Sequence, residues 1–158
     1  MKIVELNRQA QSIKRLIKST AESTNFNLEL QGHWGKYLCV LASGFLENAI
    51  SEIYIELASN SSSPQVTSFT RRMLDRIHNP MASKFIETAC SFKREWGAEL
   101  KEYFELNPKA KEAIDSIMRN RHLIAHGKTA TVSVARLAEY LDGSIEALEF
   151  IENQCGIA

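Results

Sequence analysis

The chain has 158 residues, of which 44% are hydrophobic and 24% are charged, and its formal net charge at pH 7 is zero. A chain of this length can bury a core large enough to fold without disulfides or metal ions. Its balanced charge argues against a dedicated duplex-DNA binder, because such proteins carry a basic excess that neutralises phosphates. Seven glycines and three prolines are few for this length, which favours long helices over an all-β fold.

The three cysteines, Cys39, Cys90 and Cys155, lie far apart and form no Cys-x-x-Cys pair. We therefore expect reduced thiols rather than a zinc site or a disulfide framework, and we predict no metal and no other cofactor. The first eight residues contain no apolar segment of a signal peptide, and no apolar run approaches transmembrane length. These features predict a soluble, cytoplasmic protein without a membrane partner.

Apolar residues recur at spacings of three and four over residues 3–21, which predicts an amphipathic N-terminal helix. A longer second helix is expected from about His33 to Ala58, and Gly32 and Gly35 loosen its start. Pro64 follows a run of serines and fits the first position of another helix. Three shorter helices are then expected over 65–78, 81–94 and 95–106.

Asn107 and Pro108 have the residue types of a helix cap and of the first helical position, and Gly127 is placed to end the same helix. Ser133 then caps a last helix with a regular apolar stripe. The predicted fold is therefore all-α, an up-down bundle of four main helices with short helices inserted between the second and the third. We expect a single domain over 1–158, with its core over about 30–152.

The last turns of the penultimate helix gather polar and titratable side chains among apolar neighbours. Within eight residues lie Arg119, Asn120, Arg121, His122 and His126. At about 100° per residue, Arg121 falls on the apolar stripe that also includes residues 114, 117 and 124. A buried guanidinium needs an acceptor, so this position calls for an explanation.

Two structural interpretations need no catalysis. Arg121 pairs with a carboxylate on a neighbouring helix, for which Glu47 and Glu52 are the candidates, both on the predicted second helix. His126 is then a cation at the carboxyl end of a helix, where the helix dipole favours positive charge.

The stretch from Arg121 to His126 resembles the motif of HEPN domains, the higher-eukaryote and prokaryote nucleotide-binding family. That motif is an Arg, usually a polar residue next to it, and a His after four to six intervening residues. Arg121 and His126 match it with four intervening residues, and His122 occupies the polar position. Arg119 and Asn120 match it with six. The order of helices over about residues 30–152 is similar as well, most of all to the bacterial RiboL-PSP-HEPN subgroup.

The resemblance implies a metal-independent endoribonuclease that cleaves single-stranded RNA, often as a toxin or phage-defence effector. A neutral imidazole can take the proton of a ribose 2′-OH, and an Arg can stabilise the charge that develops on the attacked phosphate. The implied catalytic residues are Arg121 and His126, and the products are a 2′,3′-cyclic phosphate and a 5′-OH. The supporting residues are Arg119, Asn120, His122 and Glu47.

The implied partners are RNA and a second copy of the chain, because HEPN proteins pair so that both motifs face one composite cleft. In toxin members an antitoxin or another partner protein joins them. Some HEPN toxins have a Tyr two residues after the motif His, where regulatory nucleotides are attached. Here that residue is Lys128, so the sequence does not support that control.

Two alternatives to the ribonuclease remain open. Many HEPN proteins have lost activity and bind a nucleotide or a protein instead, and such a module would not cleave RNA. A purely structural domain, in which Arg121 and His126 serve packing, is the other alternative.

Several residues outside the motif are further candidates. Glu47 either touches the motif Arg or faces solvent. His33 and Trp34 could stack a nucleobase, although the core or an interface is the preferred interpretation for Trp34. The basic pairs Arg71–Arg72 and Lys93–Arg94 fit a solvated face or a guide for RNA backbone, and His78 fits a loop.

Overall fold

The computed structural model describes residues 1–24, 27–130 and 132–157. Within these ranges the chain forms seven helices and no strand. The helices are α1 (Val4–Ser23), α2 (Leu28–Ser61), α3 (Pro64–Leu74), α4 (Ala82–Phe92), α5 (Arg94–Leu106), α6 (Pro108–Ala125) and α7 (Val134–Gln154). The predicted all-α fold, with short helices between the second and third main helices, is confirmed.

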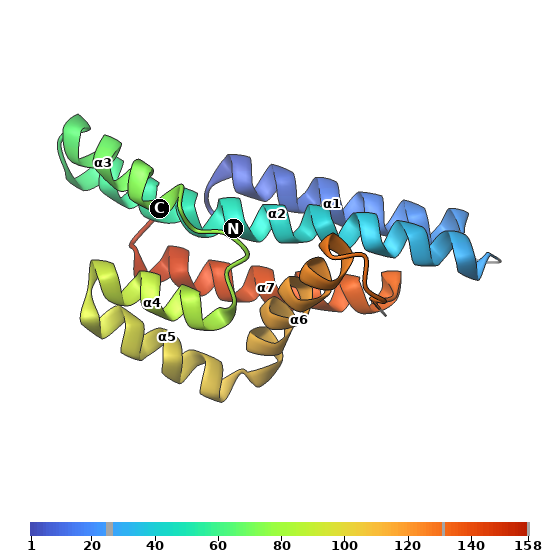
Figure 1. Ribbon diagram of the computed structural model, residues 1–158. Coiled ribbons are helices and arrows are strands. Elements are labelled where there is room, and N and C mark those ends of the chain that lie inside the picture. Colours follow the sequence, from blue (N-terminus) through green and yellow to red (C-terminus); the bar gives the residue numbers. More distant parts are fainter. Residues whose placement is uncertain (25–26, 131, 158) are drawn as a thin grey trace.

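The four long helices form the body of the molecule (Figure 1). α1 and α2 run antiparallel side by side, and α7 packs along both of them. α6 crosses obliquely and packs on α2 and α7. α4 and α5 form a hairpin that contacts α6, whereas α3 packs on α2. Of the inserted helices, α3 therefore covers part of α2, whereas the α4–α5 hairpin packs on α6.

α2 is the central helix, and it begins earlier than the sequence predicted. Asn27 caps it by accepting a hydrogen bond from the Leu30 N–H at 2.9 Å, so the helix starts five residues before His33 and includes both Gly32 and Gly35. Further along, Leu38, Ile50 and Ile53 are fully buried. Each such side chain contributes on the order of 2 kcal/mol through the removal of apolar surface from water.

The length and composition of α2 also meet the criteria for a membrane-crossing helix. Its most apolar 18-residue window has a mean hydropathy of 1.3, and 61% of that window is buried inside the protein. The expectation that no apolar run approaches transmembrane length is therefore corrected. Packing against α1, α3, α6 and α7 explains this composition, because a helix surrounded by other helices is apolar on most of its faces.

α3 ends four residues before the predicted position, and a tight turn follows it. The helix stops at Leu74, where we expected it to reach 78. Asn79 has φ +50°, in the left-handed region that Asn tolerates better than most residues. Ile77 and Pro80 are buried on either side of it. The periodicity before Asn79 thus reflects a packed turn rather than helix.

α6 fixes the start of α4 through a buried carboxylate. The N-cap residue of α4, Met81, offers no side-chain cap. Instead, Asp115 of α6 accepts a hydrogen bond from the Ala82 N–H at 2.8 Å, and its other oxygen accepts one from Lys111 at 2.7 Å. The hairpin of α4 and α5 is therefore joined to α6 by a polar contact as well as by packing.

The two predicted helix caps behave differently. Ser133 caps α7, because its hydroxyl accepts a hydrogen bond from the Arg136 N–H at 3.1 Å. Asn107 makes no side-chain cap for α6, since its amide donates to the Tyr103 carbonyl of the preceding helix at 2.9 Å. Pro108 does occupy the first turn of α6, as predicted.

Candidate functional site at the carboxyl end of helix α6

α6 ends in a regular glycine turn that fixes the backbone of His126. Gly127 has φ +64°, its N–H donates to the Ile124 carbonyl at 3.1 Å, and the Lys128 N–H donates to the Leu123 carbonyl at 2.9 Å. This pair of bonds satisfies carbonyls that a helix end would otherwise leave open. The prediction that Gly127 ends the helix is confirmed, and it places His126 at the helix C-cap.

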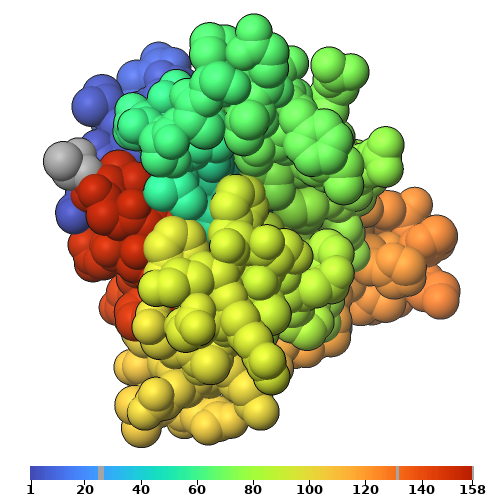
Figure 2. All heavy atoms as spheres, turned by 90° about the vertical axis from the view of Figure 1, so that its left-hand side faces the viewer, coloured from blue at the N-terminus to red at the C-terminus, as the bar shows by residue number. Residues whose placement is uncertain are grey.

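The end of α6 projects from the body of the protein (Figure 2, orange). His122 and His126 are both exposed there. Their ring centroids lie 4.4 Å apart, with 58° between the ring planes. The spacing of one helical turn explains this contact, which places two imidazoles side by side on the projecting surface.

Arg121 lies on another face of the same turns and lines a groove. The groove has a volume of about 380 Å³ and is formed by α2, by the turn after α3 and by Arg121 of α6. Glu47 and His78 line it as well. Arg121 is half-buried, and among the described residues its side chain makes no hydrogen bond and has no carboxylate within 4 Å.

The carboxylates proposed to neutralise Arg121 have other partners. Glu47 accepts hydrogen bonds from His78 Nδ1 at 3.1 Å and from the Asn79 N–H at 3.0 Å. Glu52 pairs with Arg71 at 3.4 Å. The interpretation of Arg121 as half of an ion pair with Glu47 or Glu52 is therefore not what the structure shows.

Arg119 and Asn120 are bound to their own helix. The Arg119 guanidinium donates to Glu112 and to the Ser116 hydroxyl, and the Asn120 amide donates to the Ser116 carbonyl at 2.9 Å. The two arginines therefore differ: Arg119 has acceptors within α6, whereas Arg121 faces the groove. No hydrogen bond joins Arg121 to His126 within the described residues, and the groove is lined by Arg121 but not by His126.

An aromatic pair near the start of α2 is exposed rather than part of the core. Trp34 and Tyr37 are 37% and 52% exposed, and their rings meet edge to face at 5.6 Å. A Cβ on Gly35 would lie 2.8 Å from the Val132 carbonyl oxygen, so α2 lies close to the segment that follows α6. The core placement considered for Trp34 is wrong, and Tyr37 was not foreseen from the sequence.

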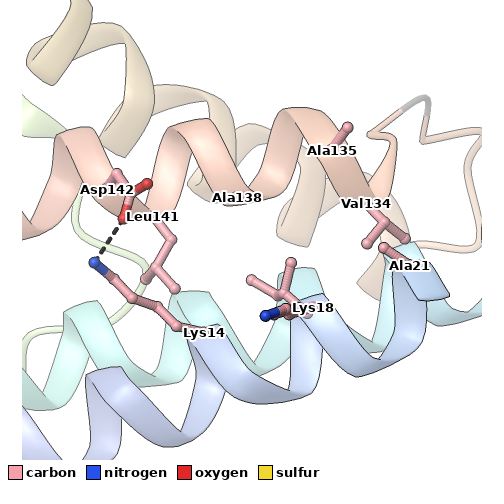
Figure 3. A pocket seen from close by; sticks show the side chains of 9 residues that line it. Lys14, Lys18, Ala21, Val134, Ala135, Ala138, Leu141 and Asp142 are labelled. Carbon is pink, nitrogen blue, oxygen red and sulfur yellow. Dashed lines mark ion pairs between the residues drawn. The ribbon is translucent and has the colours of Figure 1, made fainter.

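A second hollow, between α1 and α7, contains none of the motif residues (Figure 3). It has a volume of about 280 Å³, and Ile17, Leu141 and Ala138 contribute to its apolar lining. Lys14 of α1 bridges to Asp142 of α7 at 2.6 Å along its edge. Over the described ranges, no three His, Cys, Asp or Glu side chains are grouped closely enough to hold a metal ion.

Comparison with known protein families identifies the family of this helical domain. Residues 5–156 match the family RiboL-PSP-HEPN. The chain therefore belongs to the HEPN family, whose members include RNase-type and nucleotide-binding domains. Within that family it falls in the RiboL-PSP subgroup. Searches of curated proteins and of solved structures returned no match.

Proposed function

We propose that the protein is a metal-independent endoribonuclease that cleaves single-stranded RNA, with Arg121 and His126 as its catalytic residues. This proposal rests on the exposure of the two side chains and on the partners available to them. His126 is exposed on a projecting helix end, and Arg121 lines a groove without a carboxylate partner among the described residues. Membership of the HEPN family supports the general kind of chemistry.

In this proposal the His126 imidazole takes the proton of a ribose 2′-OH, and the oxygen attacks the adjacent phosphorus. The Arg121 guanidinium binds two phosphate oxygens at once and stabilises the charge that develops on them. Asn120 and His122 are the sequence neighbours of Arg121, and His122 is the better placed to orient the phosphate because its ring centroid lies 4.4 Å from that of His126, whereas the Asn120 amide is bound to the Ser116 carbonyl.

Because the groove at Arg121 is not lined by His126 of the same chain, we propose that two copies of the chain pair and bring both α6 ends to one cleft. The projecting shape of this end supports such pairing. We further propose that the protein acts in the cytoplasm as a toxin or a phage-defence effector, held in check by an antitoxin or another partner protein.

The test is cleavage of single-stranded RNA in EDTA by the purified chain, beside Arg121→Ala and His126→Ala. We expect the unsubstituted chain to yield 2′,3′-cyclic phosphate ends and each variant to lose this activity. Equal cleavage by all three proteins would refute the assignment of the two residues. No cleavage by any of them, together with a nucleotide-dependent rise in melting temperature, would favour a nucleotide-binding module instead.

A further inference from the structure

The groove beside Arg121 contains a carboxylate–histidine pair that the HEPN motif does not include. Glu47 Oε1 lies 3.1 Å from His78 Nδ1. An ionised carboxylate only accepts hydrogen bonds, so with Glu47 ionised His78 Nδ1 is the donor of this bond. The other ring nitrogen, Nε2, makes no hydrogen bond within the described part of the chain, and 75% of the His78 side chain is exposed. The pair thus orients an imidazole and leaves its second nitrogen available.

The backbone around His78 is fixed as firmly as its ring. Ile77 is buried before it and Pro80 after it. The second oxygen of Glu47 accepts the Asn79 N–H at 3.0 Å, which holds that residue in its left-handed conformation. One carboxylate of α2 therefore holds both the ring of His78 and the main chain next to it.

The groove is lined by three carboxylates, by the Arg121 guanidinium and by the His78 imidazole. Of its three carboxylates, Glu47 is bound to His78 and the Asn79 N–H, and Glu52 is paired with Arg71. Asp75 remains as a negative charge, which disfavours a long stretch of RNA backbone. The guanidinium and the imidazole that line the groove are the groups suited to bind a phosphate and to move a proton at it.

We propose that His78 is a further catalytic residue, the general acid that protonates the leaving 5′-oxygen of the phosphate bound by Arg121, and that Glu47 is its positioning residue. This inference rests on the proposed ribonuclease function. It locates the second imidazole of the reaction in the same chain as Arg121, rather than in the motif of a partner copy.

The proton balance of the step is complete with these groups. The 2′-oxygen forms a bond to phosphorus while the bond between phosphorus and the 5′-oxygen breaks. The proton of the 2′-OH passes to the imidazole of His126 from the second copy of the proposed pair, and the proton on Nε2 of a cationic His78 passes to the 5′-oxygen. The products are the cyclic phosphate and a 5′-OH, and exchange with water restores both imidazoles.

The deciding experiment compares two RNA oligomers that differ in one atom. One has the normal 5′-oxygen at a cleavage site mapped with the unsubstituted chain, and the other has a bridging 5′-sulfur there. A thiolate is a much weaker base than an alkoxide and leaves without a proton. General-acid catalysis is worth about 10²- to 10⁴-fold. We therefore expect His78→Gln to cleave the oxygen substrate at least about 100-fold more slowly and the sulfur substrate at close to the unsubstituted rate.

The other variants divide the possible outcomes. His126→Ala should lose cleavage of both oligomers, because the attacking 2′-OH needs a base with either leaving group. Glu47→Gln should show the same sulfur rescue as His78→Gln with a smaller defect. Glu56→Gln is the matched control, since it alters an exposed carboxylate of the same helix α2 that does not line the groove and does not bind His78, and it should cleave both oligomers normally.

Each contrary result has a distinct meaning. If His78→Gln cleaves the oxygen substrate at the unsubstituted rate while Arg121→Ala and His126→Ala do not, the role of His78 is refuted and the proposed function stands. An equal loss on both oligomers refutes the general-acid role as well. If the unsubstituted chain cleaves neither oligomer, both proposals fail.

Discussion

The polar side chains in the two halves of α6 differ in burial and in their hydrogen-bond partners. In the first half, Asp115 and Ser116 are buried, and both have hydrogen-bond partners inside the chain. In the last turns, Arg121, His122 and His126 are half-buried or exposed, and within the described residues their side chains have no ion pair with a carboxylate. The buried polar groups of the first half therefore bond within the protein, and Asp115 joins α6 to α4. The polar side chains of the last turns are available to bind a partner outside the chain.

The apolar residues of α6 follow the same division. Ile114, Ile117 and Met118 are fully buried, whereas Ile124, about two to three turns later, is only partly buried. Burial on the order of 2 kcal/mol per side chain holds the first half in place. Substitutions in the first half should therefore act on stability, and substitutions in the last turns on activity.

The largest effect we expect is on activity, from Arg121→Ala. Loss of a group that stabilises developing charge lowers the rate of RNA cleavage by about 100- to 1000-fold. The melting temperature should barely change, because Arg121 has no carboxylate partner to lose. Arg121→Lys is the control, and it should recover only part of the rate, since lysine lacks the bidentate geometry. A large fall in melting temperature for Arg121→Ala would show that both halves of α6 are structural.

The next effect is on stability, from Asp115→Ala. Removal of this carboxylate leaves the buried Ala82 N–H without its acceptor, at a cost of about 2–3 kcal/mol. Chemical denaturation should show the loss as a lower midpoint with an unchanged slope. RNA cleavage per folded molecule should stay the same, and a specific loss of cleavage would contradict the division of α6.

A smaller effect is expected from Gly127→Ala. An alanine at φ +64° costs about 1 kcal/mol, and relaxation of the turn shifts His126 as well. The matched control is Gly156→Ala, because Gly156 ends α7 with φ +66° and hydrogen bonds of the same pattern. Both variants should lose similar stability, but only Gly127→Ala should lose RNA cleavage. Equal cleavage by the two variants would mean that the position of His126 is unimportant.

The smallest effect is expected from Arg119→Ala. Its ion pair with Glu112 is about half exposed on both sides, and such pairs contribute about 0.5 kcal/mol or less. Thermal melting should therefore shift only slightly, and RNA cleavage should stay close to that of the unsubstituted chain. A loss of cleavage as large as that of Arg121→Ala would make Arg119 the motif arginine, with six residues between it and His126.

The sequence predicted the existence of the long helices well, because α1 and α7 each bury a regular stripe of apolar side chains and α2 is apolar on most of its faces. The start of α2 was missed because Gly32 and Gly35 suggested a loosened helix, whereas Asn27 caps it further upstream. The end of α3 was predicted too late, because apolar periodicity continues beyond the last helical residue, Leu74. Ile77 continues the apolar period of the helix, yet it is buried from a turn.

The candidate site was predictable only where it is local in the sequence. The contact of His122 with His126 follows from a spacing of four residues on one helix. The pairing of Glu47 with His78 joins residues that are 31 positions apart and depends on the turn after α3. No periodicity indicates such a contact, so His78 looked like an ordinary loop residue until the fold placed it beside α2.

The projecting end of α6 has a consequence for how the rate of cleavage depends on protein concentration. A convex surface touches an RNA strand from one side only. Under the proposed pairing, an isolated chain therefore supplies only one of the two α6 ends that form the cleft. Below the dissociation constant of the pair, the rate should then grow with the square of the protein concentration, and above it in direct proportion. The level of expression would in that case act as the switch, with a sharper threshold than an enzyme that works alone could give.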